Sequence, residues 1–380
     1  MSPRFEIVAG SASQGPRTGR LHTAHGTLDT PAFLPVGTHG AVRGLAPRDL
    51  VEVGVQGLLA NTYHLHLRPG EALIAKLGGL HRFMGWDGPI LTDSGGFQIH
   101  SLDPLCERSE AGVRFTSPLD GRRIILDPES SIRIQEALGA DLIVTLDEFD
   151  PIGDDRGPGV RERVRAQMER TVRWSERCLR ARTHPGPLLF GIVQGGGFPE
   201  LRRESAERTA RLGFEAFAIG GLGVGESRAE RALLVETVVS ALPSDRPRYL
   251  MGLGTPEDLI QAVARGIDLF DCVVPTRHAR HGSVFTRRGP LHLRNARFRD
   301  DPEPLDPDDE RSPVRAWSRA YLRHLLVSNE MLGARLLSWH NLGFYTALLS
   351  EARAAIAAGR FERWQSRWLE RYHSGARAVS

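Results

Sequence analysis

The 380-residue chain has few of the residues that form crosslinks or membrane anchors. Its three cysteines, Cys106, Cys178 and Cys272, are scattered and odd in number, so the sequence predicts no disulfide framework. No apolar run is long enough to cross a bilayer. The first residues lack the charged-then-apolar pattern of a signal peptide. We therefore expect a cytoplasmic protein that does not enter a membrane.

Lysine is almost absent as well, because Lys76 is the only one and arginine supplies nearly all of the positive charge. The net charge of +3 and the pI of about 9.0 are mildly basic. Such a charge allows binding to a polyanion without requiring it. Hydrophobic residues make up 41% of the chain. That content suits one large barrel with an appendage as well as two domains.

The sequence does contain a regular alternation of short apolar runs and amphipathic segments of helix length. Roughly eight such repeats, with near-continuous apolar runs, predict a parallel (β/α)8 TIM barrel. A doubly wound sheet is the alternative, but it usually carries a glycine-rich phosphate loop after its first strand. Residues 35–40 (PVGTHG) match that loop poorly. The apolar runs are 32–36, 57–61, 89–92, 141–147, 188–194, 214–220, 248–252 and 268–273.

Two regions fall outside the repeat. Residues 5–30 have the pattern of strands and turns that precede the barrel. Residues 294–325 are polar and rich in charge and proline, and a helix is predicted over 314–326. We expect a barrel with N-terminal strands over 1–293, a small inserted subdomain over 294–345, and C-terminal helices that pack on the barrel over 346–380.

Polar residues and glycines recur where the apolar runs end. Residues 92–98 (TDSGGFQ) place a carboxylate, a hydroxyl, two glycines, an aromatic ring and an amide at one point. An aspartate at a strand end is often only a helix cap. In a parallel barrel, however, the carboxyl ends of the strands carry the active site, and six such ends in chain order indicate a shared site. The later ends carry Asp147, Gln194, Gly220, Gly221, Met251 and Asp271.

These residue types narrow the chemistry. Three aspartates without a nearby His/Cys cluster argue against metal-dependent hydrolysis, and no serine with a base partner has the spacing of known hydrolase motifs. Paired carboxylates suit displacement at an anomeric carbon, where one attacks and another moves a proton. Glycines beside an amide and an aromatic ring suit a flat heterocycle. The residues therefore predict glycosidic chemistry with a nucleobase as leaving group.

These motifs resemble those of the bacterial-type tRNA-guanine transglycosylases, the queuine tRNA-ribosyltransferase family, over nearly the whole chain. The resemblance implies a (β/α)8 barrel with an inserted subdomain and a glycosyltransferase of queuosine biosynthesis. Its substrates would be tRNA with a GUN anticodon and a 7-deazaguanine base such as preQ1, which replaces the wobble guanine by double displacement through a covalent Asp–RNA intermediate. The matching stretches are 61–65, 92–98, 190–196, 218–222, 249–252 and 270–277.

The resemblance also implies a role for each site residue. Asp271 would attack the ribose C1′, and Asp93 would act as general acid and base. Phe97, where many members have tyrosine, and Met251 would sandwich the base. The base edge would be read by Ser94, Asp147, Gln194, the Gly221 backbone and the Leu222 carbonyl, and the flanking anticodon nucleotides would be held by Arg277 and Arg280.

The chain departs from the family pattern in two places. The family's structural zinc is held by three cysteines and a distant histidine. Here Asp309, Arg311 and Val314 stand at the cysteine positions and only the histidine, His340, remains. We therefore expect no metal and no other cofactor, since arginine and valine cannot be zinc ligands. The second departure is Phe149, where bacterial members usually have cysteine, and it leaves the identity of the inserted base open.

Two other functions remain open beside base exchange on tRNA. One is the same chemistry on another base or nucleic acid, and the other is a non-catalytic tRNA-binding partner subunit. Retention of both aspartates argues against the latter, because such a subunit gains nothing from two desolvated carboxylates. We also expect a homodimer. Trp317, Tyr321 and His324 share one helix face and match positions of the family's dimer interface.

Overall fold

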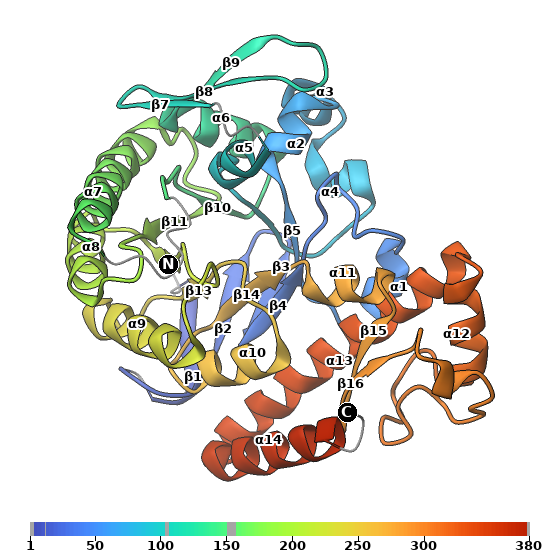
Figure 1. The fold of residues 1–380 in the computed structure, drawn as a ribbon. Helices are drawn as coiled ribbons and strands as arrows, with labels where there is room; N and C mark the ends of the chain where they lie inside the picture. The colour runs from blue at the N-terminus through green and yellow to red at the C-terminus, as the bar shows by residue number, and fades with distance from the viewer. Residues whose placement is uncertain (1–3, 12, 103–105, 150–156, 378–380) are drawn as a thin grey trace.

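The computed structural model describes residues 4–11, 13–102, 106–149 and 157–377 (Figure 1). Its centre is a barrel of eight parallel strands in the order β4-β14-β13-β12-β11-β10-β6-β5, and a parallel bridge between Val36 and Leu59 joins the two ends. The predicted (β/α)8 fold is confirmed, and the closed sheet excludes the doubly wound alternative. The strands are β4 (Ala32–Pro35), β5 (Leu58–Ala60), β6 (Ile90–Thr92), β10 (Leu142–Val144), β11 (Leu188–Val193), β12 (Ala216–Ile219), β13 (Arg248–Leu250) and β14 (Leu269–Cys272).

Helices surround the strands in a ring (Figure 1). Local sequence sets where several of them begin, because a polar cap precedes the first turn. The side chains of Asp127, Ser227 and Thr255 each accept a hydrogen bond from the backbone N–H three residues further on. The larger barrel helices are α6 (Pro128–Leu138), α7 (Pro158–Ala181), α8 (Pro199–Arg211), α9 (Arg228–Ala241) and α10 (Pro256–Val263), and the shorter ones are α1 (Pro47–Glu52), α2 (Thr62–Leu67), α3 (Glu71–Lys76), α4 (Gly79–Met84) and α5 (Gly96–Leu102).

Two small antiparallel sheets are attached to the barrel. The first, β1 (Phe5–Gly10), β2 (Arg17–Thr23) and β3 (Gly26–Thr30), shares a hydrophobic cluster with the barrel strands and contacts Asp141 and Asp268, which precede β10 and β14. There the buried Arg17 donates to Asp268 through Nε at 3.0 Å and Nη2 at 2.5 Å. The second sheet, β7 (Glu107–Ser109), β8 (Gly112–Thr116) and β9 (Arg123–Leu126), was not predicted from the sequence.

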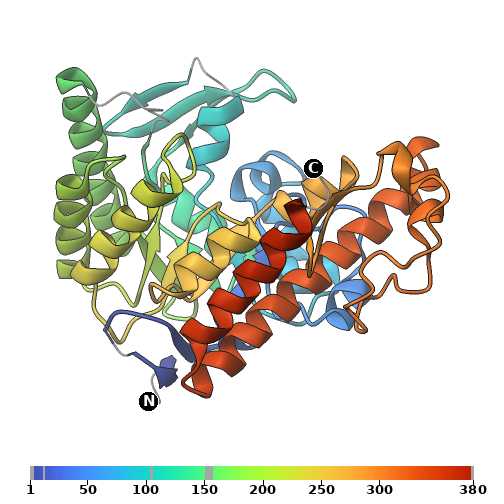
Figure 2. The same cartoon turned by 60° about the horizontal axis from the view of Figure 1, so that its bottom comes forward.

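The C-terminal part begins with α11 (Val274–Arg280), which follows β14 directly. The helix predicted over 314–326 begins later, because Ser318 caps it by accepting from the N–H of Tyr321. α13 (Met331–Ala357) runs without interruption through residue 345 and lies beside α14 (Phe361–Arg377) in both views (Figures 1 and 2). The remaining elements are β15 (Ser283–Thr286), β16 (Gly289–His292), η1 (Ala296–Phe298) and α12 (Arg319–Val327).

Hydrophobic packing joins the C-terminal helices to the barrel. Phe344, Tyr345 and Trp368 belong to the same buried cluster as barrel residues such as Phe33 and Phe270. A separate cluster around Val314 and Leu322 fills the inserted subdomain. No helix of the described residues is long and apolar enough to span a membrane.

Candidate active site

Asp271 lies in β14, with its side chain turned into the barrel mouth and only 9% of its surface exposed. Its Oδ1 accepts hydrogen bonds from the Tyr249 hydroxyl at 2.6 Å and the Gly252 N–H at 2.8 Å. Burial raises the pKa of this carboxyl. Because both donors bind the same oxygen, the arrangement fixes the carboxylate and leaves Oδ2 for another partner.

Asp93 follows β6 directly and is likewise buried. Its Oδ1 accepts from the Thr62 N–H at 2.8 Å, and its Oδ2 accepts from the amides of Asn61 and, at 2.8 Å, of Gln98. Burial raises its pKa to about 6, and the nearby charge of Asp271 acts in the same direction. A carboxyl with such a pKa can take up and release a proton near neutral pH, as a general acid–base group must.

Asp147, Ser94 and Gln194 come together at the ends of β10, β6 and β11. The Asp147 carboxylate accepts from the Gln194 amide at 2.7 Å and from the Ser94 hydroxyl at 3.5 Å. Burial raises the pKa of Asp147 to about 6. Among the described atoms, the buried Gln194 Oε1 has no hydrogen-bond partner. The group therefore presents acceptors to the donor edge of a flat heterocycle.

The glycines beside Gln194 leave space for its side-chain amide, because a Cβ at either position would collide with it. A Cβ at Gly221, whose φ is +65°, would lie 2.4 Å from the Gln194 Oε1, and one at Gly220 would lie 2.5 Å from its Nε2. Arg202 of α8 connects the loops that follow β11 and β12. Its fully buried guanidinium donates hydrogen bonds to the carbonyls of Gly196 at 2.8 Å, Gly220 at 2.6 Å and Gly221 at 3.0 Å. Burial lowers the pKa of Arg202 to about 10.

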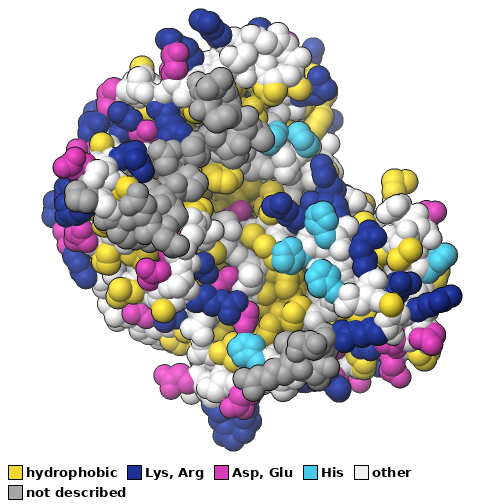
Figure 3. All heavy atoms as spheres, in the orientation of Figure 1, with side chains coloured by type: hydrophobic (Ala, Val, Ile, Leu, Met, Phe, Trp, Pro, Cys, Tyr) yellow, Lys and Arg dark blue, Asp and Glu magenta, His cyan; other side chains and the backbone are white. Residues whose placement is uncertain are grey.

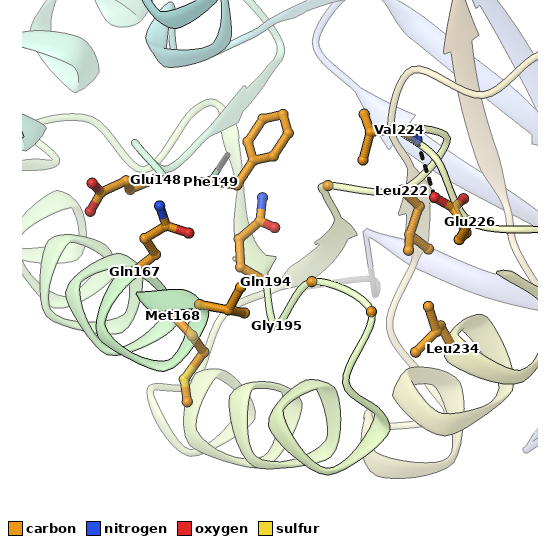
Figure 4. Close-up of a pocket in the computed structure, with 14 residues that line it drawn as sticks. Glu148, Phe149, Gln167, Met168, Gln194, Gly195, Leu222, Val224, Glu226 and Leu234 are labelled. Atoms are coloured by element: carbon orange, nitrogen blue, oxygen red, sulfur yellow. Dashed lines mark hydrogen bonds between the residues drawn. The ribbon is translucent and has the colours of Figure 1, made fainter. Parts of the chain in front are cut away.

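Phe149 lies over this glycine-lined edge. Figure 4 shows its ring above Gln194, with Leu222 and Val224 on the opposite side. The exposed ring of Phe97 is parallel to it within 4°, with centroids 5.8 Å apart. The cleft lined by Phe149, Gln194, Leu222 and Val224 has a volume of about 20 Å³, which is room for about one water molecule. A larger group therefore enters this cleft only when Phe149 or its neighbours move.

Arg277 and Arg280 are on α11, next to the mouth that contains Asp271. Arg277 is exposed, and neither arginine makes an ion pair with any described residue. Burial lowers the pKa of Arg280, and the nearby Arg43 and Arg277 lower it further, which marks a concentration of positive charge. Figure 3 shows histidine and arginine side chains gathered over α11 and β15. This face suits an anionic ligand.

The residues at the family's zinc positions do not fit a zinc ion. Val314 is fully buried in the subdomain core. Both ring nitrogens of His340 are engaged, since Nδ1 lies 3.0 Å from the Ser312 hydroxyl and Nε2 lies 2.8 Å from the Phe285 carbonyl. With only one histidine and Asp309 in place, the tetrahedral set of a structural site is incomplete.

One cluster of three possible metal ligands occurs among the described residues, at the opposite end of the barrel. His25 and His81 lie 2.8 Å and 3.0 Å from different oxygens of Asp141. Their rings stack at 3.5 Å with only 16° between the planes. The nitrogen lone pairs therefore run side by side instead of converging on one ion. This geometry is that of two hydrogen bonds to a shared carboxylate.

The residues that hold the site residues in place were not predicted from the sequence. Asn61, Thr62 and Gln98 lie in stretches already identified by resemblance, but their contacts with Asp93 follow only from the fold. Tyr249 has the pattern of a buried strand residue, and nothing in that pattern indicates that its hydroxyl binds Asp271. Arg202 had a signal, because it shares a helix face with the buried Ser205.

Comparison with known proteins identifies close relatives. The family model described as Queuine tRNA-ribosyltransferase matches residues 12–374. The queuine tRNA-ribosyltransferase of Thermus thermophilus is 52% identical over 358 residues, which cover 94% of this chain and 91% of the relative. That of Solidesulfovibrio magneticus is 49% identical over 375 residues, 98% of each chain. That of Acidithiobacillus ferrooxidans is 49% identical over 372 residues, again 98% of each chain.

Proposed function

Because the chain belongs to the queuine tRNA-ribosyltransferase family, we propose that it replaces the wobble guanine of tRNA with a 7-deazaguanine such as preQ1. Members of this family are pentosyltransferases. The observation that supports the reaction best is the pair of buried carboxylates, Asp93 and Asp271, at the mouth of one barrel. They are close enough that the charge of Asp271 raises the pKa of Asp93.

In the first displacement, Asp271 attacks the ribose C1′ of the wobble nucleotide. Since Oδ1 is held by Tyr249 and Gly252, Oδ2 forms the new C1′–O bond. The glycosidic bond breaks, and guanine leaves with its electron pair and takes a proton from Asp93. The RNA then remains bound to Asp271 as an ester.

In the second displacement, the incoming base loses a proton to Asp93 and its nitrogen attacks C1′. The C1′–O bond breaks, and Asp271 recovers its charge. One carboxyl thus gives and takes the same proton in the two halves of the reaction. A pKa of about 6 suits both roles, because neither protonation state is strongly disfavoured near neutral pH.

The base would be recognised at its edge and on its face. Ser94, Asp147 and Gln194 supply the hydrogen-bond partners described above, and the Gly221 N–H and Leu222 carbonyl extend this edge. An aminomethyl substituent such as that of preQ1 would donate to the Leu222 carbonyl. Stacking would come from Phe97 and Met251. These assignments follow the family motifs.

The tRNA would be held by the cations of α11, the exposed Arg277 and the half-buried Arg280. Arg277 and Arg280 have no acidic partners in the described part of the chain, so their charge is available to the anticodon loop, here of the GUN type. We also propose a homodimer formed through Trp317, Tyr321 and His324. Tyr321 keeps 40% of its surface exposed, although aromatic side chains are usually buried in cores or interfaces.

We further propose that polar contacts in the inserted subdomain replace the zinc crosslink. Asp308 binds both Arg288 at 2.5 Å and Arg371 at 2.8 Å, so it joins the loop to the β15–β16 turn and to α14. Arg319 binds Asp301 at 3.1 Å. His340 then packs between the loop and β15 without acting as a ligand.

The decisive experiment is exchange of radiolabelled guanine into a tRNA with a GUN anticodon. We expect incorporation by the unmodified protein and a denaturant-resistant RNA complex, and we expect Asp271→Asn to lose both. Asp245→Asn, at an exposed carboxylate, is the matched control and should behave as the unmodified protein. A trapped complex with Asp271→Asn would contradict the nucleophile assignment. A complete lack of exchange by the unmodified protein would favour the non-catalytic subunit.

A further inference from the structure

A groove of about 530 Å³ lies away from the barrel mouth, between α13, α14 and the tip of the β15–β16 hairpin. Trp364, half-buried, and Trp368, buried, contribute their rings to its wall. The lining is otherwise strongly cationic, and Glu351 is the one acidic residue among the described residues that line it. Its arginines are Arg287, Arg360, Arg363, Arg367 and Arg371.

Most of this positive charge is not neutralised by the protein. Glu351 is already bound by Arg287 at 2.7 Å and Arg311 at 3.2 Å. In contrast, Arg360, Arg363 and Arg367 are exposed and make no ion pair with any other described residue. Arg360 directly precedes α14, and Arg363 and Arg367 are four residues apart, so these two lie on one face of the helix. The groove thus presents a row of free guanidinium groups.

The chemistry of this row suits an RNA backbone better than a lipid surface. A helix that binds a membrane needs an exposed apolar face, whereas Phe361, Trp368 and Tyr372 of α14 are buried against the protein. Guanidinium groups bind phosphates through paired hydrogen bonds, and a nearby aromatic ring offers a stacking surface. The proposed substrate of the chain is itself a polyanion.

The position of the groove indicates which part of the RNA it can reach. The hairpin strand β15 follows α11 and spans about 13 Å before the tip at Arg287. The C-terminal half of α14 is next to this tip, because Arg371 and Arg288 share Asp308. Arg363 is roughly 12 Å further along the helix axis. An RNA stem of about five base pairs is at most about 17 Å long, because A-form RNA rises less per base pair than the roughly 3.4 Å of B-form DNA.

We propose that the groove between α13, α14 and the β15–β16 tip binds the backbone of tRNA outside the anticodon arm. This proposal rests on the proposed function, since it assumes that the anticodon loop docks at α11. The groove would then contribute affinity for the whole tRNA and take no part in base exchange itself.

The test compares two RNA substrates with one pair of variants. Arg363→Glu/Arg367→Glu reverses two charges in the groove, and Arg163→Glu/Arg203→Glu reverses two exposed charges on α7 and α8, which also lack ion pairs among the described residues. Guanine exchange is measured on a full-length tRNA and on its isolated anticodon stem-loop. For the groove variant we expect the KM for full-length tRNA to rise about tenfold at unchanged kcat, with a salt dependence weaker by about two phosphate contacts. The KM for the stem-loop should not change.

Each other outcome overturns the proposal. An equal rise in KM for the full-length tRNA and the stem-loop would place the contact within the anticodon arm. An equal rise in KM for the control variant would show that only the overall charge of the protein matters. Unchanged kinetics combined with lost binding to phosphatidylserine vesicles would assign the groove to a membrane. Exchange on the stem-loop by the unmodified protein keeps the proposed function standing in all of these cases, so the two ideas fail separately.

Discussion

Replacing Arg202 with methionine should separate a positioning role in the site from a contribution to stability alone. The change keeps an unbranched chain about as long as the arginine stem up to Nε, but it removes the guanidinium donors to the carbonyls of Gly196, Gly220 and Gly221. Each buried carbonyl left unpaired costs about 1–3 kcal/mol. Burial also lowers the pKa of Arg202 from 12.5 to about 10, which means that the buried charge destabilises the folded state. Removing this charge therefore raises the unfolding free energy by roughly 3 kcal/mol and offsets part of the loss. We expect a net loss of stability of about 3 kcal/mol.

The effect on activity should be larger than this loss of stability suggests. Freed carbonyls turn toward water, and the Gly221 backbone that borders Gln194 moves with them. A displacement of about 1 Å in a positioned group costs about 100-fold in rate, so the kcat/KM for guanine should fall by about that factor. Arg202→Lys, which restores one charged donor, should recover part of it. The measurements are guanine-exchange kinetics at saturating tRNA and thermal unfolding.

Arg17 provides the control. It is another fully buried arginine, paired with Asp268 at the far end of the barrel. Breaking a buried pair costs about 3–5 kcal/mol, so Arg17→Met should lose at least as much stability while keeping the KM for guanine. Should Arg202→Met lower the melting temperature yet leave guanine kinetics unchanged, the positioning role would be refuted.

Four further predictions concern pH, metal, assembly and RNA. Because the pKa of Asp93 rises from 3.8 to about 6 on folding, its ionised form destabilises the folded state by roughly 3 kcal/mol. Asp93→Asn should therefore be more stable than the unmodified protein at pH 8 and lose this advantage below about pH 4, and a pH-independent difference in unfolding free energy would contradict this. The same variant should abolish exchange while tRNA binding persists. Chelators should change neither the melting temperature nor the exchange rate, whereas one zinc per chain by elemental analysis, lost together with stability, would show that His340 is a ligand after all. Tyr321→Glu should convert a dimer into a monomer by light scattering, and a monomer mass for the unmodified protein at micromolar concentration rules the dimer out. Arg277→Ala should weaken binding to a cognate stem-loop more than to a scrambled one, and equal losses would make it a general phosphate contact.

The barrel could be predicted because each of its strands gives the same sequence pattern independently of the others. Every strand is buried on both faces, so each one is an apolar run whatever its neighbours are, and β11 is buried at all six positions. The sheet β7–β9 was not predicted from the sequence, because its strands are short and half exposed and so give no apolar run. Alternation was present in β8, where Val113 and Phe115 are buried and Arg114 is exposed, but only over five residues.

The candidate site was predicted unevenly for a different reason. Side chains that would meet the base, such as Asp93 and Asp147, stand at strand ends and can be located from the runs alone. The groups that orient them come from other elements, as when α2 brings the Thr62 N–H to Asp93. Such pairs are set by tertiary contacts and leave no local pattern. Arg202 is intermediate, since helical periodicity places it on the buried face but does not say which carbonyls it meets.

The narrow cleft beneath Phe149 has a consequence for the substituent that an incoming base can carry. The cleft lies between Phe149, Gln194 and Leu222, and Asp93 and Asp271 are not among the described residues that line it. Its volume of about 20 Å³ holds about one water molecule, so a larger substituent fits beside Gln194 only when the ring of Phe149 or a neighbouring side chain moves. Under the proposed base exchange, one aromatic side chain would thus limit the size of the inserted base, while the two carboxylates that carry out the displacements lie outside the cleft.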